Sequence, residues 1–177
     1  WAKQIGQDFH ARFSATGRRY IYWLLVRPQR PGLLHKRVGW FHQSLDIDAM
    51  QRAAICMIGE HDFSAFRAAE CQAKSPVKVL RELHITRRGE TIRFEFAADA
   101  FLQHMVRNIV GSLVYVGSGR EPPGWMDELL RSRDRKLAAP TYSAAGLYLA
   151  GVDYDAVWGL PPRPGLEALE NAMLTGA

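Results

Sequence analysis

The sequence predicts an α+β domain in which helices cover one face of a mostly antiparallel or mixed sheet. Residues 77–98 alternate apolar and polar side chains on both sides of a turn, which is typical of a β-hairpin. The predicted elements follow one another as strand, helix, hairpin, long helix, short helix and strand, which places adjacent strands beside helices. Such a sheet leaves its other face available to bind a partner.

The first half of the chain supplies a strand and a helix. Residues 18–26 (RRYIYWLLV) are aromatic and apolar without helical spacing, so we expect a strand, closed by the turn sequence RPQRPG. Residues 45–59 have helical spacing, with Asp46 as the N-cap and Gly59 as the C-terminal stop. Residues 59–76 lack clear periodicity and are expected to form a structured loop. One face of the helix would carry Ile47, Met50, Ala54 and Met57.

The second half supplies the hairpin, two helices and a last strand. The hairpin should turn at Arg88 and Gly89. Residues 101–117 are expected to form a long helix, residues 122–134 a short helix preceded by proline, and residues 146–154 a strand.

The long apolar segment 101–117 (FLQHMVRNIVGSLVYVG) has a charged residue, Arg107, in its middle. At about 100° per residue, two adjacent apolar stripes cover an arc of roughly 220°, and Arg107 lies at the border of this arc. Two interpretations are open: the guanidinium reaches solvent at the rim of a core helix, or it enters a cleft and pairs with a carboxylate or phosphate. The less apolar strip holds His104, Asn108, Gly111, Ser112 and Tyr115. Two of these are small enough to allow close approach of another backbone.

Positive charge is concentrated near the start of the chain. The net charge is +5, and residues 1–40 contain eight basic side chains and one acidic one. Residues 8–23 (DFHARFSATGRRYIYW) interleave arginines, which neutralise phosphates, with aromatic rings, which stack unpaired bases. The structural alternative is a strand whose aromatic side chains fill the core. We prefer this alternative for Tyr22 and Trp23, and both interpretations stay open for Tyr20.

The same choice applies to the segment DFSAFRA, where Asp62 could simply cap a turn and Arg67 could be structural.

The two cysteines, Cys56 and Cys71, have neither a CxxC pattern nor suitably spaced histidines, so we expect no metal site. No run approaches the ~20 apolar residues that span a bilayer, so no membrane partner is expected. The low cysteine content favours a reducing, cytoplasmic location.

Four blocks carry a resemblance to a known family. They are DFHARFSATGRRYIY, GEHDFSAFRA, FLQHMVRNIVGSL and AAGLYLAGVDY, and they span about residues 8–155 in this order. Together they resemble the C-terminal half of the TruA family of tRNA pseudouridine synthases. The resemblance implies the pseudouridine synthase fold and conversion of uridine to pseudouridine in the tRNA anticodon arm, at tRNA positions 38–40. It also implies that no cofactor is used and that a homodimer holds the tRNA in basic clefts.

The resemblance also divides the chain. Residues 1–160 would be the C-terminal domain, and residues 161–177 a Pro-rich tail with a short helix near 166–174. The family's nucleophile is an aspartate in a Gly-Arg-Thr-Asp motif of an N-terminal domain, and this sequence, which starts at Trp1 without a methionine, lacks that motif. We therefore expect a fragment that is inactive on its own.

Individual residues receive roles from the same resemblance. Tyr20 matches a tyrosine that lies against the target uracil, Arg107 an arginine that pairs with the catalytic aspartate, and Leu147 an apolar residue packed against the flipped base. Further substrate contacts are expected from Arg12, Arg18, Arg19 and Arg67. In a dry pocket, desolvation raises the pKa of a nucleophilic carboxyl group, and an adjacent guanidinium opposes this rise.

Two other classes of function are compatible with the residues. One is a non-catalytic RNA-binding module of RNA-recognition type, with stacking aromatics on a sheet, although no Gly-Phe-x-Phe pattern supports it. The other is a protein-interaction or structural domain that uses the apolar helix as an oligomer seam.

Overall fold

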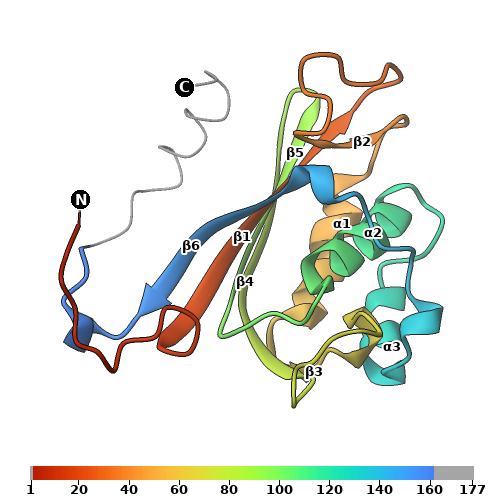
Figure 1. The fold of residues 1–177 in the computed structure, drawn as a ribbon. Helices are drawn as coiled ribbons and strands as arrows, with labels where there is room; N and C mark the ends of the chain where they lie inside the picture. The colour runs from red at the N-terminus through yellow and green to blue at the C-terminus, as the bar shows by residue number, and fades with distance from the viewer. Residues whose placement is uncertain (1, 162–177) are drawn as a thin grey trace.

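The computed structural model describes residues 2–161, and these form one six-stranded mixed sheet with three α-helices (Figure 1). The strand order is β2-β1-β5-β4-β3, with β6 also paired to β1; β1–β2 is parallel and the other pairings are antiparallel. The predicted α+β class is confirmed, whereas the expected helix near 166–174 lies outside the described residues. The strands are β1 (Ala15–Val26), β2 (Gly39–Phe41), β3 (Gly59–Asp62), β4 (Val77–Arg88), β5 (Thr91–Ala98) and β6 (Leu147–Tyr154). The helices are α1 (Ile47–Ala54), α2 (Met105–Gly117) and α3 (Trp125–Ser132).

Strand β1 separates two hydrophobic clusters. Tyr22 and Leu24 belong to the main core, which the strands share with all three helices. Ile21 and Trp23 point to the opposite face and pack in a smaller cluster with Val38. The helices lie together on one side of the sheet, as predicted (Figure 1). The other face is not bare, however, because the smaller cluster covers it beside the end of β1.

The pairing of β1 with β6 is interrupted beside Tyr20. Arg19 pairs with Gly151 and Tyr20 pairs with Leu149, so Ala150 is left over in β6 as a β-bulge. A bulge increases the local twist and redirects neighbouring side chains, and bulges are common next to functional sites.

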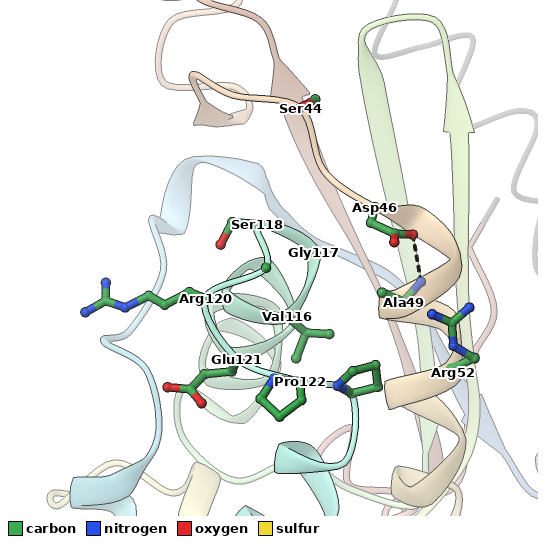
Figure 2. A pocket seen from close by; sticks show the side chains of 12 residues that line it. Ser44, Asp46, Ala49, Arg52, Val116, Gly117, Ser118, Arg120, Glu121 and Pro122 are labelled. Carbon is green, nitrogen blue, oxygen red and sulfur yellow. Dashed lines mark hydrogen bonds between the residues drawn. The ribbon is translucent and has the colours of Figure 1, made fainter.

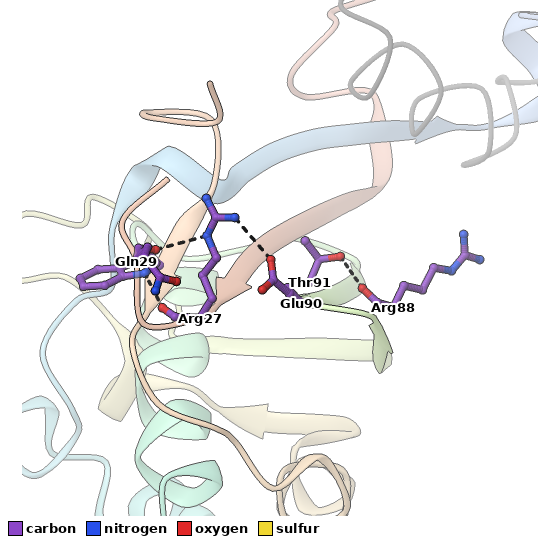
Figure 3. Close-up of polar contacts among 6 residues, drawn as sticks. Arg27, Gln29, Arg88, Glu90 and Thr91 are labelled. Carbon is purple, nitrogen blue, oxygen red and sulfur yellow. Dashed lines mark hydrogen bonds and ion pairs between the residues drawn. The ribbon is translucent and has the colours of Figure 1, made fainter. Parts of the chain in front are cut away.

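The predicted hairpin is confirmed as β4 and β5. Gly89 in its turn has a φ of 58°, a left-handed conformation that glycine adopts without strain. Contacts at this end of the sheet tie the hairpin to β1 (Figure 3). Arg27, just after β1, forms an ion pair with Glu90 at 3.4 Å. Within the hairpin, the Thr91 hydroxyl donates to the Arg88 carbonyl at 2.8 Å.

The first helix has the predicted start but ends earlier. The Asp46 carboxylate accepts a hydrogen bond from the Ala49 N–H at 2.9 Å, which confirms the N-cap. Helix α1 ends at Ala54, and a 3₁₀ turn follows. The prediction for Gly59 was wrong: with a φ of 110° it begins strand β3, inside the expected loop. Strands as short as β2 and β3 depend on pairing with a neighbour more than on a local pattern.

Helix α2 also differs from the prediction. It begins at Met105 and not at Phe101, because His104 has a left-handed conformation with a φ of 62°. The middle of the less apolar strip is covered, since Asn108 and Ser112 are fully buried. The segment 139–143 packs on it.

Gly111 makes this packing possible. A Cβ atom at Gly111 would lie 2.6 Å from the Pro140 carbonyl oxygen, so the expected close approach of another backbone is confirmed.

Gly111→Ala should therefore destabilise the chain. Alanine gains about 1 kcal/mol of helix propensity over glycine, but the clash with a backbone oxygen forces a shift that costs typically 1–3 kcal/mol. We expect a net loss in the free energy of unfolding, measured by urea denaturation. Gly32→Ala is the matched control, because nothing lies within 4 Å of its added Cβ. Equal stability of the two variants would contradict the close packing.

Asp62, which was open between a functional and a capping role, has a structural one. Its carboxylate accepts a hydrogen bond from the Ser64 N–H at 2.9 Å and pairs with Arg133 at 3.3 Å. Burial alone would raise the pKa of Asp62, but the hydrogen bonds from Ser64 and the positive charges of Arg133 and Arg67 outweigh it, so the pKa is lowered.

Asp62→Asn should lower the free energy of unfolding only at pH values at which the wild-type carboxyl group is ionised. A lowered pKa in the folded state stabilises the protein above the ordinary aspartate pKa of about 3.9. That contribution disappears as the pH falls through the lower, folded-state value. Urea unfolding should show the wild type more stable than the variant at pH 7, with a smaller difference at pH 3. A difference independent of pH would contradict the assigned contacts.

Candidate functional site

Three elements meet at a pocket of about 300 Å³. Strand β1 contributes Tyr20, the start of β6 contributes Leu147, and the first turn of α2 contributes Arg107. Residues 101–104 and Ala144 complete this side of the lining. The three residues to which the resemblance assigns active-site roles therefore surround one cavity, although the roles themselves stay predictions.

One wall of the pocket is aromatic and apolar. The Tyr20 ring meets Phe101 edge to face, with ring centroids 5.1 Å apart and an interplanar angle of 87°. In the described part of the chain, the Tyr20 hydroxyl has no hydrogen-bond partner. Leu147, which also lines the pocket, is half-buried. This wall can hold a planar ring that has left its stack.

Arg107 brings a positive charge to the lining of the same pocket. Its Nε–H donates to the Tyr142 carbonyl at 2.7 Å. Its terminal nitrogens, Nη1 and Nη2, have no acceptor among residues 2–161, so the end of the guanidinium is available to a ligand. The first turn of α2 adds the positive end of the helix dipole. Both features favour a carboxylate or a phosphate at this place, which supports the cleft interpretation of Arg107 over the solvated rim.

Two of the four supporting arginines lie on the approach to β1. Arg12 is exposed, with its guanidinium 5.8 Å from the centre of the Phe13 ring. Phe13 is itself 77% exposed. Arg18 donates to the carbonyls of Arg12 at 2.7 Å and Asp99 at 2.8 Å, so it holds the loop before β1 in place. Neither residue lines the pocket, and Arg12 is the better placed of the two to meet a phosphate.

The other two supporting arginines are engaged elsewhere. Arg19 lies on the sheet face opposite Tyr20 and forms an ion pair with Glu82 at 2.7 Å. Arg67 donates to the carbonyls of Cys71 at 2.6 Å and Ala73 at 2.9 Å, which folds the loop after β3. Neither is brought to the pocket, and their substrate contacts stay predictions.

The aromatic residues of segment 8–23, for which the sequence allowed a core or a stacking role, differ in burial. Tyr22 is fully buried and Trp23 is 8% exposed, so the core interpretation is confirmed for both. Burial raises the pKa of Tyr22, whose hydroxyl donates to the Ser143 carbonyl at 2.7 Å. Sequence reasoning missed Phe101 and Ala144 as pocket residues. The polar residues Gln103 and His104, just before Met105, were the sequence signal that Phe101 precedes the helix. No local pattern around Ala144 indicates that it lines a pocket.

A larger cavity, about 650 Å³, lies between the start of α1 and the end of α2 (Figure 2). Its charges are mixed, since Arg52 and Arg120 share it with Asp46 and Glu121. The Arg120 side chain extends away from Arg52 (Figure 2). None of its described lining residues is aromatic, so it lacks the aromatic wall that the smaller pocket has. The smaller pocket is the better candidate despite its volume.

Within residues 2–161, no group of three or more His, Cys, Asp or Glu side chains is arranged to hold a metal ion. In the same range, no helix has the length and apolar character needed to cross a membrane.

Known proteins match this chain closely. Residues 53–155 match a family model described as tRNA pseudouridine synthase. The chain is 59% identical over 161 residues to tRNA pseudouridine synthase A of Dechloromonas aromatica, which covers 91% of this chain and 62% of that protein. It is 59% identical over 161 residues to the protein of the same name from Nitrosomonas eutropha, covering 91% and 58% respectively. The chain thus spans about three fifths of the length of these curated relatives. The family model covers more than half of the chain, and the chain therefore belongs to the tRNA pseudouridine synthase family.

Proposed function

We propose that this chain is the C-terminal part of an enzyme that converts uridine to pseudouridine in the tRNA anticodon arm, at tRNA positions 38–40. The observation that carries the proposal is the pocket of about 300 Å³, which joins an aromatic and apolar wall to the available end of the Arg107 guanidinium. Family membership supplies the class of reaction, and the pocket supplies a place for the base and for an anionic group beside it.

The reaction exchanges one bond of the nucleoside for another. The bond from uracil N1 to the ribose C1′ breaks, a bond from C5 to C1′ forms, C5 loses a proton and N1 gains one. The detached base must be retained while it turns. Tyr20, Phe101 and Leu147 offer surfaces to hold it, and the Tyr20 hydroxyl is available to the reacting base or to a water molecule.

The nucleophile in this proposal is an aspartate of an N-terminal domain outside this chain. A carboxylate that approaches Arg107 meets two terminal nitrogens in a fork that matches its two oxygens. This pairing keeps the carboxyl ionised in a pocket that desolvates it. Residues 1–160 would form the C-terminal domain and residues 161–177 a tail. The homodimer and the use of no cofactor rest on the resemblance alone, and the cytoplasmic location rests on the low cysteine content.

The alternative functions have less support. A non-catalytic RNA-binding module would display stacking aromatics on an open sheet, whereas Tyr22 and Trp23 are buried. An oligomer seam along α2 would need its apolar surface exposed, but Ile109, Val110 and Leu113 lie in the core of this chain.

Arg107→Met in the full-length protein should lower kcat by about 100-fold or more, because a charge-stabilising group at the reacting centre is lost. Tritium release from tRNA labelled at uridine C5 measures the rate, and a gel shift should show little change in tRNA affinity. Arg52→Met is the matched control, since this exposed arginine borders the other cavity. An unchanged rate in Arg107→Met would rule out the ion pair with the nucleophile.

Arg12→Gln should weaken binding of all tRNA substrates to a similar degree. If Arg12 contacts a phosphate, the plot of the logarithm of the association constant against the logarithm of the salt concentration should be less steep in the variant, by about one unit of slope. Filter binding at several salt concentrations gives the slope. Arg131→Gln serves as the control, because this exposed arginine belongs to α3, and α3 lies away from the start of β1 (Figure 1). Equal slopes for Arg12→Gln and the wild type would place the phosphate contact elsewhere.

A further inference from the structure

We propose that Asn108, Thr141 and Arg135 form a positioning network that fixes the Arg107 guanidinium through the main chain of Tyr142. The catalytic consequence of this network rests on the function proposed above, whereas its effect on Arg107 does not.

The network closes around the side chain of Asn108, which is fully buried. Asn108 Nδ2 donates to the Phe66 carbonyl at 2.8 Å, and this bond fixes the orientation of the amide. Asn108 Oδ1 accepts from the Thr141 hydroxyl at 2.7 Å and from Arg135 Nη2 at 3.1 Å. Arg135 Nη2 also approaches the Thr141 hydroxyl oxygen at 3.1 Å, so the three side chains form a triangle.

Tyr142 transmits this constraint to Arg107. It follows Thr141 directly, its N–H donates to the Arg107 carbonyl at 3.3 Å, and its own carbonyl accepts from Arg107 Nε at 2.7 Å. One residue is thus bonded to both the main chain and the side chain of Arg107. Because Thr141 is tied to Asn108, the residue next to Arg107 in the helix, the position of the Tyr142 carbonyl is set relative to α2 itself.

Further contacts prevent the segment 139–143 from sliding along α2. The Tyr142 hydroxyl donates to the Trp40 carbonyl at 2.9 Å, and the Pro140 carbonyl lies against Gly111. Arg135 Nη1 donates to the Ala139 carbonyl at 3.0 Å. The segment is therefore held at each end and in its middle.

The anchored nitrogen determines which part of Arg107 a ligand can reach. An arginine side chain has many rotamers, and no carboxylate within the described residues pairs with this one. With Nε committed to Tyr142, the side chain is held at its bend and the two terminal nitrogens form the accessible edge. Preorganised groups of this kind lose less entropy when the reacting partner arrives. The Arg107–Asn108 pair thus combines a group that faces the ligand with a group that holds it.

Thr141→Val tests the network, because it removes the hydroxyl while it nearly keeps the shape of the side chain. Nitrogen-15 NMR of the 177-residue chain follows solvent exchange of the Arg107 Nε–H. We expect exchange about tenfold faster or more in Thr141→Val, since local opening exposes the bond. Thr141→Ser, which keeps the hydroxyl, should remain close to the wild type. Ser143→Ala is the matched control, because it deletes a hydroxyl whose one partner among residues 2–161 is the Ala145 N–H at 3.2 Å.

The same variants in the full-length enzyme connect position to catalysis. Thr141→Val should lower kcat by about ten- to a hundredfold with an unchanged KM for tRNA, and Thr141→Ser should restore it. The single ammonium group in Arg135→Lys cannot reach all the acceptors of Arg135. This variant should therefore also show faster Nε–H exchange of Arg107 and a lower kcat, as expected for Thr141→Val.

Unchanged exchange of the Arg107 Nε–H in both Thr141→Val and Arg135→Lys would overturn the network. A loss of kcat without faster exchange would also overturn it, because the defect would then arise elsewhere. If the wild-type full-length protein forms no pseudouridine, the proposed function fails, and the exchange measurement still decides whether the network positions Arg107.

Discussion

Strand β1 constrains the rest of the structure because both of its edges and both of its faces are in use. Strand β5 binds one edge, β6 and β2 share the other, and the two hydrophobic clusters pack on its opposite faces. Tyr20 therefore lies on a strand with little freedom to move. Functional groups keep their geometry best when they are mounted on such rigid elements, and the aromatic wall of the pocket has this support.

The fold was predictable where local pattern decides it. The alternation of apolar and polar side chains correctly predicted the β4–β5 hairpin. The capping side chain of Asp46 correctly predicted the start of α1. Prediction failed where contacts distant in sequence decide. Strands β2 and β3 exist because β1 and β4 offer them edges, and the bulge at Ala150 breaks the alternation of β6. Asn108 is buried because two segments distant in sequence, the turn at Phe66 and the segment 139–143, pack against it.

The candidate site was only partly accessible from the residues alone. Helical geometry placed Arg107 at the border of a buried surface and left two environments open. The grouping of Tyr20, Arg107 and Leu147 came from the resemblance, since nothing in local spacing brings these three together. Phe101 was expected in the helix, but it lies in the loop between β5 and α2 and lines the pocket. That shift follows from one left-handed residue, His104, which a periodicity argument does not detect.

The placement of Arg107 has a thermodynamic consequence for the chain. A cation in the first turn of a helix faces the positive end of the helix dipole, which is unfavourable in the absence of a counter-charge. The carbonyl of Tyr142 offsets this in part, but it brings no negative charge. An anion that binds beside Arg107 relieves the remaining repulsion, so occupancy of the pocket and stability of the fold are linked. The chain gives up some stability when the pocket is empty in exchange for readiness to accept negative charge.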